Sequence, residues 1–277
     1  ITLFAQDAAG NLAFCASVVT VVDNIAPTIV SIPGDISVNN DSGACGAVVS
    51  WTEPTTTDNC SSTISQTTGV ANGSQFPVGT TTVTYVATDG SGNETQDTFT
   101  VTVTDNEAPT ASCIAGPLTV ELDANGVATI TADDINDGSS DNCTAANALT
   151  LAIDISSFDC DDIGSTTVTL TVTDENSNSA TCTTTVNIVD TVAPAITCPA
   201  TQTQSLGAGC VVTLANYTSL ATTSDNCGSI ASVTQSPPAG TSILGETTTT
   251  VTLTVTDTNG NQNTCDFDVI TVDTTAV

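Results

Sequence analysis

The chain has 277 residues, no Lys, Arg, His or Met, and 30 acidic residues that give a formal charge of -30. A protein surface that binds nucleic-acid phosphates needs clustered cationic side chains, so the composition excludes nucleic acid as a partner. Anionic membranes also attract cationic side chains, so the composition disfavours a membrane surface. No apolar run approaches the ~18 residues of a membrane-spanning helix, so no membrane insertion is expected in this segment. A hydrophobic content of 39% nevertheless indicates folded domains rather than a disordered tail.

An acidic linker motif recurs at a regular spacing. It begins at Asp23, Asp105, Asp190 and Asp273, which are 82, 85 and 83 positions apart. A second motif, D-x-x-G/S-N, begins 16 residues before each of them. A regular period of this size indicates an array of similar modules. The predicted domains are the end of one repeat (1–22), repeat 1 (23–104), repeat 2 (105–189), repeat 3 (190–272) and the start of another (273–277), so a longer parent chain is expected.

Each repeat is predicted to close with a β-hairpin. Val83, Tyr85 and Ala87 alternate mainly with Thr before the turn at Asp89, and similar alternation precedes Asp174 and Asp257. A period of two gives a strand one buried face, and Asp, Gly and Asn suit the turn. Six or seven short strands per repeat predict an all-β fold of tandem immunoglobulin-like β-sandwich domains arranged as an extended array. Trp51 is expected in a core.

Taken together, these motifs resemble hyalin repeats. Repeat 1 carries G-A-C-G-A at 43–47, D-N-C at 58–60 and the F-P-V-G-T-T stretch that runs from 76 to the D-G-S-G-N turn. Repeat 3 keeps C-P at 198–199, Cys210 and D-N-C at 225–227, whereas repeat 2 lacks the G-x-C-G-A cysteine and has Cys160. That variant resembles repeats of giant secreted surface proteins of gliding and marine Bacteroidota. The resemblance covers almost the whole chain and implies an extracellular immunoglobulin-like fold with a role in adhesion.

Eleven cysteines without any His or C-x-x-C pair point to disulfides in an oxidising, extracellular compartment rather than to a zinc site. Two cysteine positions, four residues after the linker Pro and eight after the turn Asp, are filled in repeats 2 and 3, but Ser31 and Asp97 occupy them in repeat 1. Their joint loss predicts a bond between them. The full predicted scheme is Cys113–Cys182, Cys198–Cys265, Cys45–Cys60, Cys143–Cys160 and Cys210–Cys227, with Cys15 unpaired in this segment and its partner expected upstream.

Acidic segments are expected to meet at one pole of each sandwich, where the linker, the loop after the second strand and the last hairpin turn converge. Carboxylate and amide oxygens suit Ca²⁺, which takes 6–8 oxygen ligands. The alternative is that these residues only form Asx turns. The candidate ligands are Asp23, Asn24, Asp58, Asp89 and Asn93 in repeat 1, Asp105, Asn106, Asp141, Asp174 and Asn178 in repeat 2, and Asp190, Asp225, Asp257 and Asn261 in repeat 3.

No enzyme is expected, because the chain has no His for general base catalysis, no Lys for Schiff-base chemistry and no Arg to hold an anion. A carboxylate pair as in glycosidases is the one catalytic alternative, but the acidic residues repeat module by module, as structural residues do. The first hypothesis is a calcium-stiffened, disulfide-stapled stalk or filament segment of a large secreted cell-surface adhesin, serving surface attachment or gliding motility. Its partners would be neighbouring repeats of the same chain, with surface glycans or proteins bound by other parts. The alternative is that the repeats themselves bind glycan or protein. Thr191 and Thr274 lie in motifs that resemble O-glycosylation sites.

Overall fold

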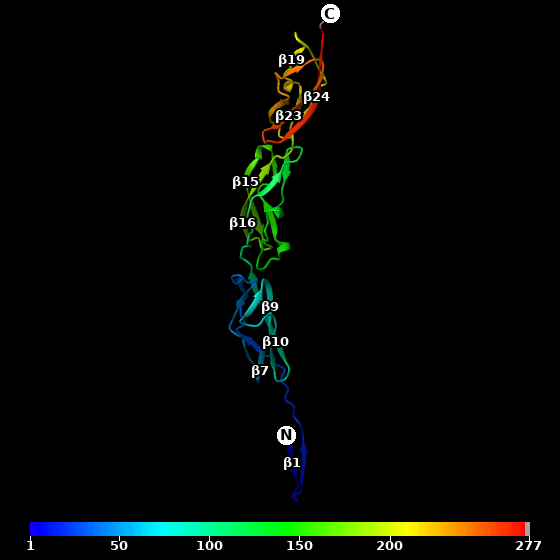
Figure 1. The fold of residues 1–277 in the computed structure, drawn as a ribbon. Helices are drawn as coiled ribbons and strands as arrows, with labels where there is room; N and C mark the ends of the chain where they lie inside the picture. Colours follow the sequence, from blue (N-terminus) through cyan, green and yellow to red (C-terminus); the bar gives the residue numbers. More distant parts are fainter. Residues whose placement is uncertain (275–277) are drawn as a thin grey trace. The chain divides into compact units, whose positions relative to one another are not determined.

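The computed structural model describes residues 1–274, and the predicted start of a further repeat lies partly outside these residues. The described chain is built of short β-strands, with 3-10 helices of one turn at Ala132–Asp134, Ala146–Ala148, Cys160–Asp162 and Thr218–Leu220. The prediction of all-β, immunoglobulin-like sandwiches is confirmed (Figure 1). Of the helices in residues 1–274, none combines the length and apolar character needed to cross a membrane.

Repeat 1 contains one four-stranded sheet and two short ribbons. Its sheet has the order β4-β10-β9-β7, in which β4 runs parallel to β10 and the other pairs are antiparallel. The ribbons are β3–β6 and β5–β8. The bounds are β3 Thr28–Val30, β4 Ile36–Asn39, β5 Gly46–Val49, β6 Thr55–Thr57, β7 Ser62–Thr68, β8 Ser74–Pro77, β9 Gly79–Asp89 and β10 Glu94–Thr104.

Repeat 2 follows the same plan with the sheet β11-β16-β15-β13 and the ribbon β12–β14. Two isolated bridges, Thr110 to Ser140 and Cys113 to Asn136, stand in place of a second ribbon. The bounds are β11 Leu118–Glu121, β12 Val127–Thr129, β13 Thr150–Ile153, β14 Ser157–Asp159, β15 Gly164–Thr173 and β16 Ser179–Val189.

Repeat 3 has the sheet β18-β24-β23-β21 and the ribbons β17–β20 and β19–β22. Its bounds are β17 Ala195–Thr197, β18 Gln202–Ser205, β19 Val211–Thr213, β20 Thr222–Ser224, β21 Ile230–Ser236, β22 Ser242–Leu244, β23 Thr248–Asp257 and β24 Gln262–Val272. The N-terminal segment forms one hairpin, β1 Thr2–Gln6 with β2 Leu12–Ala16. By its internal contacts the described chain divides into two compact units, residues 1–108 with 142–145 and residues 109–141 with 146–274.

Alternation in the hairpin strands builds each core. Val83, Tyr85 and Ala87 on β9 are buried, and the equivalent residues of β15 and β23 have no exposed surface: Val168, Leu170, Val172, Val251, Leu253 and Val255. Trp51 packs edge-on against the rings of Phe76 and Phe99, with centroid distances of 5.9 and 5.2 Å. Its indole N–H donates to the Tyr85 hydroxyl at 3.0 Å, so its role is in the core of repeat 1.

We predict that Leu253→Ala lowers the free energy of unfolding of repeat 3 by about 2–5 kcal/mol, because it leaves a cavity among fully buried side chains. The control is Leu244→Ala, which truncates a side chain that is 74% exposed and should cost less than about 0.5 kcal/mol. Hydrogen exchange of peptides from β23 and β24 across a denaturant series measures both values. Equal costs for the two variants would contradict this assignment of the core.

Candidate functional site

Three carboxylates gather where repeat 3 begins. Asp190 lies in the linker, Asp225 follows β20, and Asp257 ends β23; one oxygen from each lies within 4.8 Å of the others. The fold brings them together because β17, directly after the linker, pairs with β20, and the turn between β23 and β24 folds against the linker. Asp190 is 6% exposed and Asp257 only 1% exposed. We call this end of a repeat its N-terminal pole.

The turn residue Asp257 is fully engaged in hydrogen bonds. Its Oδ1 accepts from the backbone N–H groups of Asn259 and Asn261, both at 2.8 Å, and its Oδ2 accepts from the Asn261 amide at 2.9 Å. Burial raises the pKa of Asp257, but these bonds, led by those from Asn261, outweigh it and hold the pKa below its ordinary 3.8. Asp257 is therefore charged at neutral pH.

Equivalent bonds form in the other hairpin turns, between Asp89 and Asn93 and between Asp174 and Asn178. The Asn amides therefore donate to carboxylates, as in the Asx-turn alternative. The hydrogen bond from Asn93 Nδ2 to Asp89 is also the main cause that lowers the pKa of Asp89. A turn Asp needs no cation for its hydrogen bonding.

The linker and loop residues of repeat 3 differ, because buried oxygen atoms remain there without a partner. Asp190 Oδ1 accepts from Val192 N at 3.0 Å and from Asn226 Nδ2 at 3.2 Å, and Asp225 Oδ2 accepts from Cys227 N at 3.0 Å. Asp190 Oδ2, Asp225 Oδ1 and Asn226 Oδ1 have no hydrogen-bond partner. A buried polar atom left unpaired costs about 1–3 kcal/mol. These oxygens, from two carboxylates and one amide, form the donor set that a hard divalent cation prefers.

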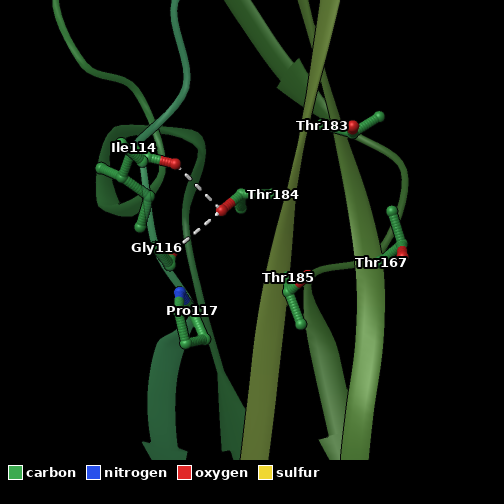
Figure 2. Close-up of a pocket in the computed structure, with 8 residues that line it drawn as sticks. Ile114, Gly116, Pro117, Thr167, Thr183, Thr184 and Thr185 are labelled. Atoms are coloured by element: carbon green, nitrogen blue, oxygen red, sulfur yellow. Dashed lines mark hydrogen bonds between the residues drawn. The ribbon is translucent and has the colours of Figure 1, made fainter.

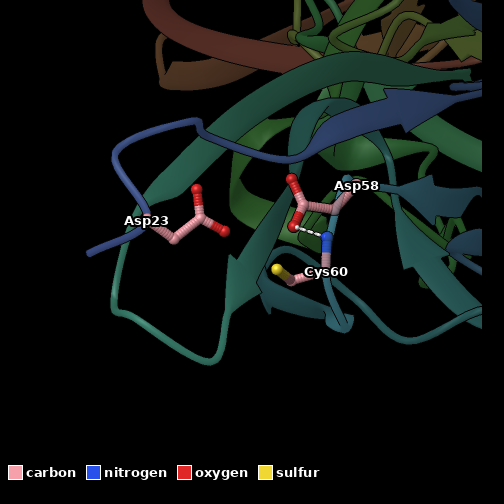
Figure 3. A group of neighbouring side chains, drawn as sticks. All are labelled: Asp23, Asp58 and Cys60. Atoms are coloured by element: carbon pink, nitrogen blue, oxygen red, sulfur yellow. Dashed lines mark hydrogen bonds between the residues drawn. The ribbon is translucent and has the colours of Figure 1, made fainter. Parts of the chain in front are cut away.

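Repeat 1 has a related cluster at its own N-terminal pole. Figure 3 shows Asp23, Asp58 and the thiol of Cys60, whose ligand atoms lie within 4.8 Å of one another. Asp23 accepts from Ile25 N at 3.1 Å and from the Asn59 amide at 3.2 Å, and these bonds hold the pKa of Asp23 below its ordinary value. Asp58 Oδ1 is buried without a partner, as Asp225 Oδ1 is in repeat 3.

The thiol of Cys60 is surrounded by carboxylates. Its hydrogen bond to Asp23 and the charge of Asp23 are the main causes that raise the pKa of Cys60, and burial and the charges of Asp58 and Asp89 add to them. Cys60 is therefore protonated at neutral pH and a poor metal ligand there.

The other predicted ligands are placed as follows. Asp105 is 2% exposed and accepts from Glu107 N at 3.1 Å, and Asp141 is half-buried. Asn24 and Asn106 are exposed and stand in no candidate cluster of the described residues. Thr191 and Thr274 are exposed, which leaves their predicted glycosylation as a hypothesis.

The disulfides differ in part from the predicted scheme. Cys113–Cys182 and Cys198–Cys265 are present, with Cα atoms 5.8 and 5.7 Å apart. The predictions of Cys45–Cys60, Cys143–Cys160 and Cys210–Cys227 are wrong. Cys45 is bonded to Cys143 and Cys160 to Cys227, with Cα distances of 4.7 and 5.4 Å, whereas Cys15, Cys60 and Cys210 are free and exposed. We call the two bonds between repeats the clasp disulfides.

Cys45 and Cys60 cannot pair because they lie at opposite poles of repeat 1. Gly43 N donates to Glu107 Oε2 at 2.7 Å, so the loop before β5 lies where the last strand ends, while Cys60 lies beside Asp23. The 11 residues of β10 span about 35 Å between these poles. The D-N-C loop of repeat 2 instead approaches the loop before β5, and Asn142 Nδ2 donates to Glu107 Oε2 at 3.0 Å.

Repeat 2 forms an equivalent clasp to repeat 3, although its cysteine stands on the other strand of the ribbon. In the β5–β8 ribbon Cys45 comes just before β5; in the β12–β14 ribbon Gly126 takes that place, and Cys160 follows Asp159, the partner of Val127. A Cβ on Gly126 would lie 2.6 Å from Cys160 Sγ and 3.0 Å from the Asn226 carbonyl oxygen. Gly126 therefore leaves room for a cysteine from across the ribbon. The missing G-x-C-G-A cysteine, together with the new Cys160, was the sequence signal for this pairing.

The hollow in Figure 2 gives no sign of catalytic chemistry. It is lined by Ile114, Ala115, Gly116, Pro117, Thr167, Thr183, Thr184 and Thr185, none of which titrates near neutral pH. The Thr184 hydroxyl is already engaged with the carbonyl oxygens of Ile114 and Gly116, each at 3.3 Å. This hollow lies between strands β15 and β16 and the loop before β11.

The family assignment follows from two matched segments. The family described as HYR domain matches residues 22–103 and 189–271, which cover repeats 1 and 3. The chain belongs to the HYR domain family. The resemblance to hyalin repeats is thereby confirmed for repeats 1 and 3, and repeat 2, whose cysteine positions differ, lies between the two matched segments.

Curated relatives include two sea urchin proteins named Hyalin. The chain is 33% identical to that of Strongylocentrotus purpuratus over 88% of its length, which is 20% of the relative, and 33% identical to that of Lytechinus variegatus over 98% of its length, which is 52% of the relative. The HYR chain thus spans about half the length of these relatives or less. These relatives do not come from gliding bacteria.

Similar solved structures include cadherin arrays. Protocadherin Gamma B2 extracellular cadherin domains 1-5 match all of this chain and 72% of theirs at 12% identity, with a TM-score of 0.40. Mouse cadherin-23 EC22-24 matches 90% of this chain and 99% of its own at 11% identity, with a TM-score of 0.34. These scores are too low to carry an argument about this chain.

We predict that peptide mapping under non-reducing conditions recovers Cys45 linked to Cys143 and Cys160 linked to Cys227. The digest needs a protease specific for acidic residues, because trypsin has no site to cut. Cys15, Cys60 and Cys210 should be alkylated before reduction. A peptide that links Cys45 to Cys60 would contradict the structure.

We also predict that Gly126→Ala impairs the second clasp. The added methyl group overlaps Cys160 Sγ, so the oxidised protein should retain two further titratable thiols, from Cys160 and Cys227. Gly138→Ala is the matched control, since Gly138 has a similar positive φ of 75° but open space around its Cα. Thiol titration of both variants in denaturant measures the difference. Equal thiol contents would show that the close approach does not control the bond.

Proposed function

We propose that this chain is a non-enzymatic structural segment of an extracellular adhesion protein, in which HYR repeats form a stalk. The observation that carries the proposal is that successive repeats are joined covalently: one clasp runs from repeat 1 to repeat 2 and another from repeat 2 to repeat 3. Disulfides persist in oxidising, extracellular compartments. Such bonds limit how far neighbouring repeats can separate when the chain is pulled, which is an advantage for a stalk under load.

The chemistry of the side chains supports a structural role. The chain has no His, Lys or Arg, and the turn Asp residues are held by hydrogen bonds from Asn and backbone N–H groups. Schiff-base and anion-clamp chemistry therefore have no residues to perform them, and general base catalysis would have to rest on carboxylates alone. Among the described residues, Phe4 and Phe14 on the β1–β2 hairpin are the exposed aromatic side chains, so repeats 1 to 3 present no exposed ring on which a sugar could stack. This favours a stalk over a glycan-binding module.

We further propose that Ca²⁺ binds at the N-terminal pole of repeat 3. Asp190, Asp225 and Asn226 would hold it through the oxygens that lack hydrogen-bond partners, and Asp257 would add charge from beside them. The ion would supply the positive charge that no side chain of this protein offers. Asn226 also donates to the Asp123 carbonyl at 3.2 Å, so the same loop contacts both the linker of repeat 3 and the loop before β12. Ordering that loop would stiffen the connection between repeats 2 and 3.

The partners proposed for this segment are adjoining HYR repeats. Cys60 completes the same D-N-C motif as Cys143 and Cys227, and Cys210 has the place of Cys45, just before the first strand of its ribbon. Both thiols are exposed. Each can therefore take a clasp from an equivalent repeat. The use in bacterial gliding stays a hypothesis that rests on the repeat 2 motif, and surface attachment is the role we favour.

The calcium proposal is tested with Asp225→Asn and the exposed control Asp266→Asn, which removes the same charge from the solvent side of β24. Calcium at about 100 times its Kd should stabilise wild type and the control by about 2.7 kcal/mol. Asp225→Asn removes one orphaned carboxylate oxygen and should lose most of that response. Calorimetry with calcium or chelator gives the response, and hydrogen exchange of peptides 190–197 and 222–229 locates it. An equal response in both variants would place the ion elsewhere.

A further inference from the structure

We propose that the Cys45–Cys143 clasp keeps the core of repeat 1 out of the covalent route that carries tension along the chain. The proposal rests on the stalk function above. The length of the stretched chain depends only on which cysteines are bonded, so the test is independent of adhesion and of calcium binding. The clasp would do for repeat 1 what a different bond does for each of the other two repeats.

Repeats 2 and 3 each have a bond that ties the segment before the sheet to the last strand. Cys113 is bonded to Cys182 on β16, and Cys198 to Cys265 on β24. Tension that enters such a repeat near its first strand can leave through the bond and spare the strands between. Repeat 1 has Ser31 and Asp97 in the equivalent places and so has no such bond.

In repeat 1 the Cys45–Cys143 clasp takes over the role of the missing first-segment to last-strand bond. A covalent route from the N-terminus reaches Cys45 and crosses directly to Cys143, which lies 98 positions further along the chain. The buried hydrophobic residues of repeat 1, from Ala47 on β5 to Val103 on β10, all lie inside the closed loop. The parts of repeat 1 that precede Cys45, including β3 and β4, remain on the route.

Beyond Cys143 the covalent network is redundant. One route runs forward to Cys160, crosses to Cys227 and returns to Cys198; the other runs back to Cys113, crosses to Cys182 and runs forward to Cys198. Each covers 46 positions before the shared crossing to Cys265. Either bond can therefore be lost without lengthening the shortest route. Cys45–Cys143 has no such substitute among the bonded cysteines.

The test stretches the whole oxidised chain between its termini by single-molecule force spectroscopy, with the free thiols alkylated. Without the first clasp, the shortest route passes through residues 45–113 and 182–198, and it gains about 38 positions. At 3.3–3.6 Å per residue, Cys45→Ser/Cys143→Ser should lengthen the fully extended chain by about 130 Å.

Each control removes one of the two disulfides whose routes can substitute for each other. Cys113→Ser/Cys182→Ser breaks a bond of separation 69 and Cys160→Ser/Cys227→Ser one of separation 67, and neither should lengthen the chain measurably. Mass mapping of each variant verifies that its remaining bonds have formed before it is stretched. An unchanged length for Cys45→Ser/Cys143→Ser, or a longer chain for Cys113→Ser/Cys182→Ser, would overturn the proposal. Loss of calcium binding or of adhesion would leave this result unchanged.

Discussion

Carboxylates without any cationic side chain are the constraint on which this structure depends. With 30 acidic residues and no Lys, Arg or His, each buried carboxylate has to be held by backbone N–H groups, by amides or by an added cation. In the hairpin turns the first two suffice, because an Asn four residues later folds back onto the Asp and lowers its pKa. At the linker and the D-N-C loop they do not suffice, and buried oxygens remain unpaired. Counting the donors to each carboxylate thus separates the turn residues from the candidate metal ligands.

Covalent bonds complement small cores. Each repeat buries a narrow set of aliphatic side chains around one to three aromatic rings, and modules of this size often gain from staples. Disulfides within repeats 2 and 3 tie the first segment to the last strand, whereas the clasps join one repeat to the next. Stability of the module and continuity of the array are therefore provided by different bonds. Repeat 1, which has only the second kind, depends on its neighbour for covalent protection.

The N-terminal pole of repeat 3 combines an acidic cluster with a disulfide. Its D-N-C motif supplies Asp225 to the acidic cluster and, directly after the Asn, Cys227 to the clasp. In repeat 3 the intervening Asn226 also donates to Asp123 and to Asp190, so three consecutive residues contact the linker, the loop before β12 and Cys160. A cation and a disulfide at the same loop would restrain the same junction. Ordering of the loop by one would reduce the conformational entropy lost when the other forms.

Sequence alone determined the repeat period, the hairpins and the core positions, because alternation of Val and Thr and the turn motifs are local signals. It also indicated Cys113–Cys182 and Cys198–Cys265, since the loss of both positions in repeat 1 records a contact. Only the tertiary structure decided the remaining pairs. Cys45 is near Cys60 in sequence but a strand length away from it in space, and whether a loop faces its own repeat or the next depends on the direction of the strands that carry it. The same holds for the acidic residues: their types suggested a cation site, but which oxygens lack donors depends on three-dimensional packing.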